Sequence, residues 1–319
     1  MKNNILNLIN SVDSILILTH VNPDGDAIGS SMAMYHALKK MNKSVDVVIP
    51  DIPPAFVFLN SNNLIKEKVD KSYDLAIVVD CPNIGRIGQL NNEFYNCKQS
   101  IVIDHHISNN MYGTINYIDD GASSCSQVIY YLFEKLKIKI NKNIGECLVV
   151  GCITDTNGFS NNNVDKETFL MIAHMFDLGI NIHEIYSLIF LKKSMSQFAL
   201  MKMTLDRLEF FCDGKIAFSY ISQEDMDNVG AAAGDYEGLV NIGKNISGVE
   251  ISIFMREDNG YKISFRSNGC DVNKLANKFG GGGHEMASGA CIDKPFKETK
   301  DMLIKATLEV LNNWWMELF

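Results

Sequence analysis

Four apolar runs of this chain each end at an acidic or histidine residue. They are SILILT before His20, LAIVV before Asp80, SIVI before Asp104-His105-His106, and CLVVGCIT before Asp155. Runs rich in Val and Ile that alternate with helical patterns are typical of a parallel sheet whose strands are buried on both faces. Ligands of such sheets bind beyond the carboxyl ends of the strands. The pattern therefore predicts an α/β fold in which these polar side chains converge at one edge.

The rest of the first half fits this fold. A helical pattern at 27–41 follows the first apolar run, a further Val-rich run lies at 45–50, and another helix is predicted near 123–137. The run before Asp155 is predicted to be a helix that ends at this residue, and 166–207 is predicted to be mostly helical. We therefore expect a parallel sheet with helices on both faces.

The second half has a different pattern. From about residue 215, apolar-rich runs at 215–221, 249–257 and 261–267 indicate strands, and the DNG sequence between the last two is typical of a hairpin turn. A helix, a glycine loop, a short strand and a terminal helix are expected to complete a smaller α/β domain. We place a first domain at 1–188, a helical connector at 189–212 and a second domain at 213–319.

Composition limits the classes of partner and the compartment. The 319 residues suggest about two domains. A net charge of −9 without a basic stripe argues against binding of a long nucleic-acid duplex. No apolar run reaches the ~18–20 residues that span a bilayer, so no membrane segment is expected. The eight cysteines are scattered without a CxxC pair, which is typical of the reduced cytosol and predicts a cytoplasmic protein.

Three candidate ligands lie within seven residues directly after the first run: His20, Asp24 and Asp26. Pro23 and Gly25 favour a tight turn that points both carboxylates into one space. An alternative is that one aspartate only caps the helix that follows. Because one cap cannot use two aspartates and a histidine, we expect metal binding.

The later segments add further ligands. Asp80 alone fits a helix cap as well as it fits a metal ligand. Asp104-His105-His106 is more specific, because adjacent histidines at a strand end are costly to bury without partners. Imidazole and carboxylate together suit manganese, iron, zinc or cobalt better than calcium. With Asp155, these segments predict a site for more than one divalent metal ion, and hence hydrolytic chemistry.

The second half contains a candidate anion site. Gly280–Gly283 and His284 follow a predicted helix and precede an apolar strand. A glycine run alone can be just a flexible loop, but its backbone N–H groups could also cradle a phosphate. Arg266, at a strand end, offers a planar fork that suits phosphate oxygens, although a lone arginine there is more often solvated. The two features together favour anion binding.

The motifs of this chain resemble those of a known family. HVNPDGDAIGS, VVDCPN, VIDHH and ITDT look like the four motifs of the DHH phosphoesterases, and FRSN and GGGGH resemble the associated DHHA1 substrate-binding domain. The resemblance covers nearly the whole chain. The chain is similar in length to bacterial nanoRNases that also act as phosphatases of 3′-phosphoadenosine-5′-phosphate (pAp), and far shorter than RecJ-type exonucleases. One departure is Cys125, which stands where the family commonly has threonine.

The resemblance implies two manganese ions in a cleft between the two domains. One ion would be held by His20, Asp24 and Asp80, and the other by Asp26, Asp80, His105 and Asp155, so that Asp80 bridges them. Three residues would have catalytic roles: Asp80, His106 as the proton donor that faces the substrate phosphate, and Asp104 as the residue that orients its neighbours. The implied substrate-binding residues are Asn22, His106, Arg266, Gly281, Gly282, Gly283 and His284.

The function implied by the resemblance is manganese-dependent hydrolysis of short oligoribonucleotides to nucleoside 5′-monophosphates, and of pAp to AMP and phosphate. The sequence is also consistent with two alternative functions. One is a phosphodiesterase for pApA or cyclic di-AMP, and the other is a catalytically silent nucleotide sensor, which would be expected to have lost a metal ligand. The apolar C-terminal segment LNNWWMELF fits either a homodimer interface or a packed helix end.

Overall fold

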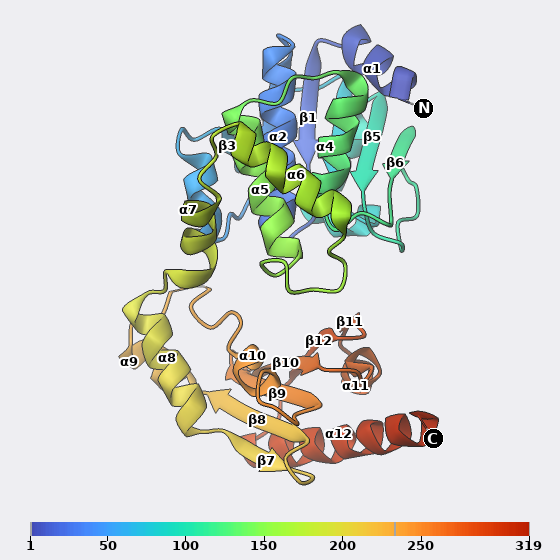
Figure 1. The fold of residues 1–319 in the computed structure, drawn as a ribbon. Helices are drawn as coiled ribbons and strands as arrows, with labels where there is room; N and C mark the ends of the chain where they lie inside the picture. The colour runs from blue at the N-terminus through green and yellow to red at the C-terminus, as the bar shows by residue number, and fades with distance from the viewer. Residues whose placement is uncertain (1, 233, 319) are drawn as a thin grey trace. The chain divides into compact units, whose positions relative to one another are not determined.

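The computed structural model describes residues 2–232 and 234–318. The chain divides into two compact units, Met1–Lys192 and Lys193–Phe319, and each has its own six-stranded sheet (Figure 1). The division falls inside the segment predicted as a connector. No helix within the described residues has the length and apolar character needed to cross a membrane. All eight cysteines are free thiols.

The first unit is built on a parallel sheet with the strand order β3-β2-β1-β4-β5-β6. Its strands are β1 (Ser14–Leu18), β2 (Ser44–Val48), β3 (Ile65–Lys66), β4 (Leu75–Val79), β5 (Gln99–Asp104) and β6 (Ile115–Ile118). The predicted parallel α/β fold is confirmed, while β3 and β6 are strands that the apolar pattern did not predict. The order reverses between β1 and β4, which is where ligands of such sheets bind.

Helices cover both faces of this sheet, as predicted. On one face Ile15 and Ile17 of β1 belong to a core whose helical residues include those of α1 (Lys2–Ser11), α2 (Gly25–Lys40), α4 (Cys125–Leu136) and α5 (Lys142–Asp155). On the other face Leu16 and Leu18 pack in a cluster with residues of the 3-10 helix η2 (Ile84–Leu90) and of α3 (Asn91–Asn96). Successive side chains of a strand point to opposite faces, so β1 is buried from both sides.

The helices α2 and α5 approach each other closely, side by side in Figure 1. A Cβ atom on Gly29 would lie 2.5 Å from the carbonyl oxygen of Cys147, and one on Gly151 would lie 2.3 Å from Oδ1 of Asp26. Glycine is therefore required at both positions. This approach places Asp155, the last residue of α5, near Asp26 in the first turn of α2.

The predicted helical stretch at 166–207 is confirmed. It contains α6 (Lys166–Asp177), α7 (Ile182–Tyr186), the π-helical turn η3 (Ser187–Leu191) and α8 (Met195–Asp206). The 3-10 helix η1 (Pro54–Asn60) connects β2 to β3 in the first half. The division between the units falls between η3 and α8, so α8 belongs to the second unit.

The second unit contains a mixed sheet in the order β11-β12-β10-β9-β8-β7. Its strands are β7 (Glu209–Phe211), β8 (Ile216–Ile221), β9 (Ile251–Glu257), β10 (Tyr261–Ser267), β11 (Gly282–His284) and β12 (Ala287–Ile292). Only the β8–β9 pair among these is parallel. The predicted hairpin joins β9 to β10, where Asn259 and Gly260 have positive φ values of 48° and 105°. The smaller α/β domain is thereby confirmed.

Four further helices complete this unit: α9 (Gln223–Asn228), α10 (Val240–Lys244), α11 (Val272–Asn277) and α12 (Phe296–Leu318). The apolar C-terminal segment lies on α12, where Trp314 and Trp315 pack against the core of the sheet. The Trp314 ring would lie 2.9 Å from a Cβ atom on Gly269. Leu311, Trp314 and Trp315 of this segment therefore pack inside the unit, whereas Met316 is 71% exposed and Phe319 lies outside the described residues.

The glycine run differs from the phosphate-cradling loop predicted for it. Gly282–His284 form β11, which pairs with β12. The N–H groups of Gly280, Gly281 and Gly283 already donate to acceptors of the same unit, namely Asn277 O, Ala276 O and Asn273 Oδ1. A backbone cradle for a phosphate is therefore not formed by these three groups. The glycines allow close packing instead, because a Cβ atom on Gly281 would lie 2.1 Å from the carbonyl oxygen of Gly289.

An ion pair between α8 and α9 gives a test of stability against pH. Both terminal nitrogens of Arg207 donate to Asp225, which also accepts from Ser222. The Arg207 guanidinium holds the pKa of Asp225 well below its usual range. Because this pKa is depressed in the folded state, the pair stabilises the fold above the unfolded value of about 3.9, and the contribution is lost as the pH falls through the folded value.

Asp225→Asn is therefore expected to lower the free energy of unfolding by roughly 1–3 kcal/mol at neutral pH. The difference from the wild type should narrow as the pH falls below about 4, because the unfolded wild-type chain then binds a proton at Asp225 while the folded carboxylate is still charged. Thermal unfolding followed by circular dichroism at several pH values measures both quantities. A difference that does not change with pH would contradict the assigned ion pair.

Candidate active site

The loop between β1 and α2 presents the first group of candidate ligands. His20 follows the end of β1, and Asp24 is the N-cap of α2, where its Oδ1 accepts from the N–H groups of Asp26 and Ala27, both at 3.0 Å. Asp24 therefore caps a helix, which is the alternative role considered for an aspartate in this loop. The same carboxyl group nevertheless lies with His20 and Asp80 in a set whose potential ligand atoms are all within 4.8 Å of one another. Capping therefore does not remove Asp24 from the cluster.

Asp26 is buried and held by the start of α4. Its Oδ2 accepts from the N–H of Cys125 at 2.6 Å, and its Oδ1 accepts from the N–H of Ser126 at 3.0 Å. Burial and the nearby charge of Asp80 raise the pKa of Asp26 to about 7. The contact at position 125 is made by the backbone, so the change from the threonine common in the family leaves it intact.

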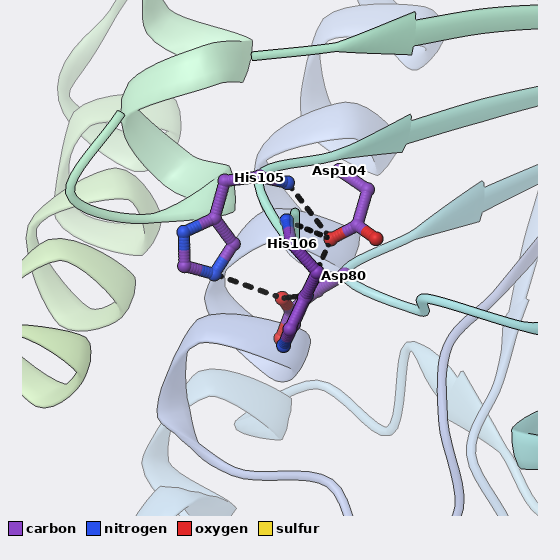
Figure 2. Close-up of side chains that lie close together, drawn as sticks. All are labelled: Asp80, Asp104, His105 and His106. Carbon is purple, nitrogen blue, oxygen red and sulfur yellow. Dashed lines mark hydrogen bonds and ion pairs between the residues drawn. The ribbon is translucent and has the colours of Figure 1, made fainter. Parts of the chain in front are cut away.

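Asp80 faces three histidines of the cluster, two of which, His105 and His106, are drawn with it in Figure 2. It follows β4, has a left-handed backbone conformation with φ of 53°, and is only 2% exposed. Nε2 of His20 lies 3.6 Å from its Oδ2, and Nε2 of His105 and Nδ1 of His106 lie 3.6 Å from its Oδ1. Burial acts to raise the pKa of Asp80, but the three imidazoles outweigh it and hold the pKa below its usual value.

Asp104 organises the two histidines that follow it. Its Oδ1 accepts from Nδ1 of His106 at 2.7 Å and from the N–H of His105 at 2.8 Å, as drawn in Figure 2. Its Oδ2 accepts from Nδ2 of Asn109 at 2.6 Å. Asp104 is completely buried. These bonds fix the ring of His106 with Nδ1 as the donor, which leaves Nε2 free for another partner.

His105 and Asp155 complete the group. Nδ1 of His105 lies 3.3 Å from the carbonyl oxygen of Ala122, and its Nε2 lies 3.6 Å from Oδ2 of Asp155. Burial lowers the pKa of His105, but Asp26 and Asp155 outweigh it and raise the pKa to about 9. Burial and the charge of Asp26 raise the pKa of Asp155 to about 8. The residues of four separate segments therefore meet in one cluster.

The donor set of this cluster fits divalent metal ions. Nδ1 of His105 lies next to a carbonyl oxygen, which can only accept, so in the neutral ring Nε2 carries the lone pair. Nδ1 of His20 lies near both a carbonyl oxygen and Nη2 of Arg86, and its Nε2 faces Asp80. The two Nε2 atoms face carboxylate oxygens at 3.6 Å, a distance too long for a hydrogen bond. Oδ1 of Asp80 is buried without a hydrogen-bond partner within the described residues. A cation between such facing acceptors would satisfy both of them.

The potential ligands fall into overlapping sets. Within the described residues, His20, Asp24 and Asp80 form one set, Asp26, His105 and Asp155 form a second, and Asp80, Asp104, His105 and His106 form a third. Because Asp80 also faces His105, it adjoins the second set. All six residues predicted as metal ligands are thus brought together in the first unit.

The residues predicted to bind substrate lie in both units. Asn22 is an exposed residue of the loop after β1 and has a positive φ of 53°. In the second unit, Arg266 of β10 and His284 of β11 are both paired with Ala287 of β12, so they lie in one row across the sheet. Arg266 lines a pocket of about 430 Å³ together with Arg256 and Lys262. Burial lowers the pKa of Arg266, which forms no ion pair with any described residue.

Some residues of the site were not predicted. Asn109 binds Asp104 but lies five residues beyond it, in a segment without periodicity. Arg86 makes two contacts with the loop after β1. Its carbonyl oxygen accepts from the N–H of Val21 at 2.7 Å, and its side-chain Nη2 lies 3.2 Å from Nδ1 of His20. The NIGR segment after Asp80 could have indicated a residue that supports the site. Cys125 and Ser126 act through backbone groups, which leave no signal in the sequence.

Comparisons with known proteins agree with this arrangement. The model of the DHH family N-terminal domain matches residues 14–152, and that of the DHHA1 domain matches residues 213–313. The chain therefore belongs to the DHH family of phosphoesterases, and it is a hydrolase. Its curated relatives include the bifunctional oligoribonuclease and PAP phosphatase NrnA of Bacillus subtilis, which is 27% identical over 301 residues, or 92% of this chain and 93% of the relative. NrnA of Thermus thermophilus is 30% identical over 283 residues, or 87% and 84% of the two chains.

Solved structures agree in fold. An exopolyphosphatase-related protein from Bacteroides fragilis matches with a TM-score of 0.91 and 29% identity, covering 98% of this chain and 96% of that chain. RecJ from Thermus thermophilus, in complex with Mn²⁺, matches with a TM-score of 0.56 and 13% identity over 97% of this chain and 53% of that chain. The RecJ likeness concerns the fold alone.

Proposed function

We propose that this enzyme hydrolyses short oligoribonucleotides to nucleoside 5′-monophosphates and pAp to AMP and phosphate. The observation that carries the proposal is the convergence of His20, Asp26, His105 and Asp155 near Asp80, whose buried Oδ1 has no hydrogen-bond partner among the described residues. The NrnA relatives, matched over most of their length, bear names that describe these two activities. The absence of a basic stripe in a chain of net charge −9 supports short substrates over a long duplex.

We propose that the cluster holds two Mn²⁺ ions. His20, Asp24 and Asp80 would hold one, and Asp26, Asp80, His105 and Asp155 the other, with Asp80 shared. Mixed imidazole and carboxylate ligands suit manganese, and two positive ions would offset the carboxylates gathered here. Such ions would supply an activated water molecule and charge neutralisation at the phosphoryl group.

His106 is the residue proposed to act on the leaving group. Its Nδ1 is held by Asp104 at 2.7 Å, so the ring can present Nε2 to a substrate oxygen. Asp104 is the positioning residue, because it is buried and binds His106 and Asn109 at once. Protonation of the leaving 3′ oxygen by His106 would release the nucleoside 5′-monophosphate. Histidine is suited to this transfer near neutral pH.

The second unit is proposed to bind the nucleotide that carries the 5′ phosphate. Arg266 and His284 lie in one row on the sheet, and the small Ala287 between them leaves space for a ligand. Gly281, Gly282 and Gly283 are proposed to lie beside the bound nucleotide, and Gly282, where an added Cβ atom would have no neighbour closer than 3.8 Å, leaves room for it. In the first unit Asn22 would contact the substrate beside the cluster. The connector at 189–212 would join the two binding surfaces, and the cytosol is the proposed location.

Arg266→Ala gives a test of this assignment. The variant is expected to raise KM for pAp by about 10- to 100-fold, the scale of a lost hydrogen bond to a charged group, with a smaller change in kcat. Arg266→Lys keeps the charge but loses the planar fork, so an intermediate KM is expected. Steady-state kinetics of phosphate release measure these values. An unchanged KM in the alanine variant would remove Arg266 from the binding site.

The proposed substrates are tested by comparing initial rates on pAp, pApA, longer single-stranded RNA and cyclic di-AMP in the presence of Mn²⁺. We expect AMP from both pAp and pApA, with lower rates on long RNA and on the cyclic dinucleotide. Cleavage of pApA without any release of phosphate from pAp would favour an enzyme for second-messenger breakdown. Cleavage of cyclic di-AMP at the highest rate would also contradict the proposal.

A further inference from the structure

A pocket in the first unit adjoins the candidate metal site without belonging to it. Its volume is about 320 Å³, near the lower end of the range of ~300–1,000 Å³ found for small-molecule sites. It lies where β1 and β2 end, and η2 forms another wall. His20 lines this pocket and also belongs to the ligand set with Asp80. A molecule in the pocket would therefore be next to the reacting centre.

The walls of the pocket suit a neutral, flat group. Val48, Ile87 and Leu90 provide apolar surface, and all three are buried. The rim includes the amide side chains of Asn22 and Gln89, each of which can both donate and accept hydrogen bonds. No lysine or arginine is among the described residues that line it, and Asp51 is acidic. A phosphate would lack a cation here, whereas a nucleobase has apolar faces and a hydrogen-bonding edge.

The local backbone shapes this pocket. Gly88, between Ile87 and Gln89, has a positive φ of 69°, and a Cβ atom there would lie 2.4 Å from Cγ1 of Val21. This close contact brings the η2 segment against the loop that carries Asn22. The bond from Val21 N–H to the Arg86 carbonyl oxygen, at 2.7 Å, holds the two segments together. The pocket is therefore a formed feature of the first unit.

We propose that this pocket binds the nucleobase on the 3′ side of the bond that is cut. The inference rests on the proposed function, in which the second unit holds the nucleotide on the 5′ side. The O3′–P bond then breaks, water supplies the new oxygen on phosphorus, and the 3′ oxygen leaves with a proton. In pApA the phosphorus carries a second nucleoside, whose base enters the pocket. In pAp it carries none, so the pocket stays unused.

The first experiment changes the substrate and leaves the protein intact. Wild-type enzyme is assayed on pApA, on the same dinucleotide with hydrogen in place of its 3′ base, and on pAp. The base-free dinucleotide is expected to have a KM roughly ten- to hundredfold above that of pApA, the scale of a group removed from an apolar pocket. Equal KM values for the two dinucleotides would overturn the proposed base site.

The second experiment changes the pocket. Val48→Phe is expected to raise KM for pApA by about tenfold or more and to leave pAp and the base-free dinucleotide within about twofold. Val48→Ala, at the same buried position, is the matched control, because it disturbs the packing but keeps the pocket open. The kinetics on pAp report whether each variant is folded. An equal rise of KM for pAp and pApA would contradict the assignment.

Failure of this inference and failure of the proposed function give different results. If the wild type releases AMP from neither pAp nor pApA, the proposed function is wrong. If it releases AMP from both and the 3′ base has no effect on KM, the proposed function stands and the pocket has no role in binding that base.

Discussion

Asp80→Asn is expected to abolish hydrolysis, with kcat on pAp reduced by about 10³-fold or more. The two carboxylate oxygens of Asp80 face His20 on one side and His105 and His106 on the other, so this residue adjoins each of the ligand sets. An amide offers one neutral oxygen in place of the charged pair. Loss of several kcal/mol of metal-derived charge stabilisation corresponds to a rate loss of this size.

The same variant should lose bound metal without losing its fold. Asparagine has nearly the shape of aspartate, and it removes a charge from a site that is only 2% exposed. Bound Mn²⁺ is measured by elemental analysis after gel filtration, and the fold by circular dichroism. Asp177→Asn, on the exposed surface of α6, is the matched control and should retain wild-type activity. Wild-type kcat in Asp80→Asn would contradict the central place given to this residue.

His106→Asn is the second variant with a large expected effect. It should lower kcat by about 10²- to 10⁴-fold, the usual contribution of a general acid, while Mn²⁺ binding changes little. The reason is that His106 has its Nδ1 bonded to Asp104, whereas His20 and His105 have Nδ1 next to backbone carbonyl oxygens. The ring of His106 is therefore held by a carboxylate, an arrangement suited to proton transfer. Steady-state kinetics and metal analysis on one preparation measure both quantities.

A double-mutant cycle separates the roles of His106 and Asp104. Asp104→Asn should lower kcat by about 10- to 100-fold by misplacing the imidazole. Once His106 is replaced, the second substitution should have little further effect, because the residue that Asp104 positions is gone. His183→Gln, at an exposed position of α7, serves as the control for loss of a histidine. Fully additive losses would contradict a positioning role for Asp104.

The arrangement of the first unit followed from its apolar runs. Ile15 and Ile17 face one core and Leu16 the other, so the run had to be a strand buried on both faces. Because β1 and β4 are parallel, their carboxyl ends lie together and bring His20 and Asp80 to the same edge of the sheet. The convergence of these residues was therefore predictable from the sequence, whereas β3, only two residues long, was too short to give a pattern.

Other features depended on contacts that a sequence does not record. Asn109 contacts Asp104 and Arg86 contacts His20, at spacings set by the turns between them. The glycine run was predicted to be a loop whose backbone N–H groups bind an anion, because glycine allows such groups to point to one side. In the structure the run packs against β12, and Gly281 and Gly283 are required by close backbone contacts. Only the tertiary fold distinguishes a glycine that binds a ligand from a glycine that allows packing.

The central claim is that Asp80 is shared between two metal ions. A crystal structure of the enzyme grown with Mn²⁺, with anomalous diffraction recorded at the manganese absorption edge, tests it most directly. Two anomalous peaks are expected, one beside His20 and Asp24 and the other beside Asp26, His105 and Asp155, with Asp80 bound to both ions. A single peak, or two peaks of which only one contacts Asp80, would contradict it.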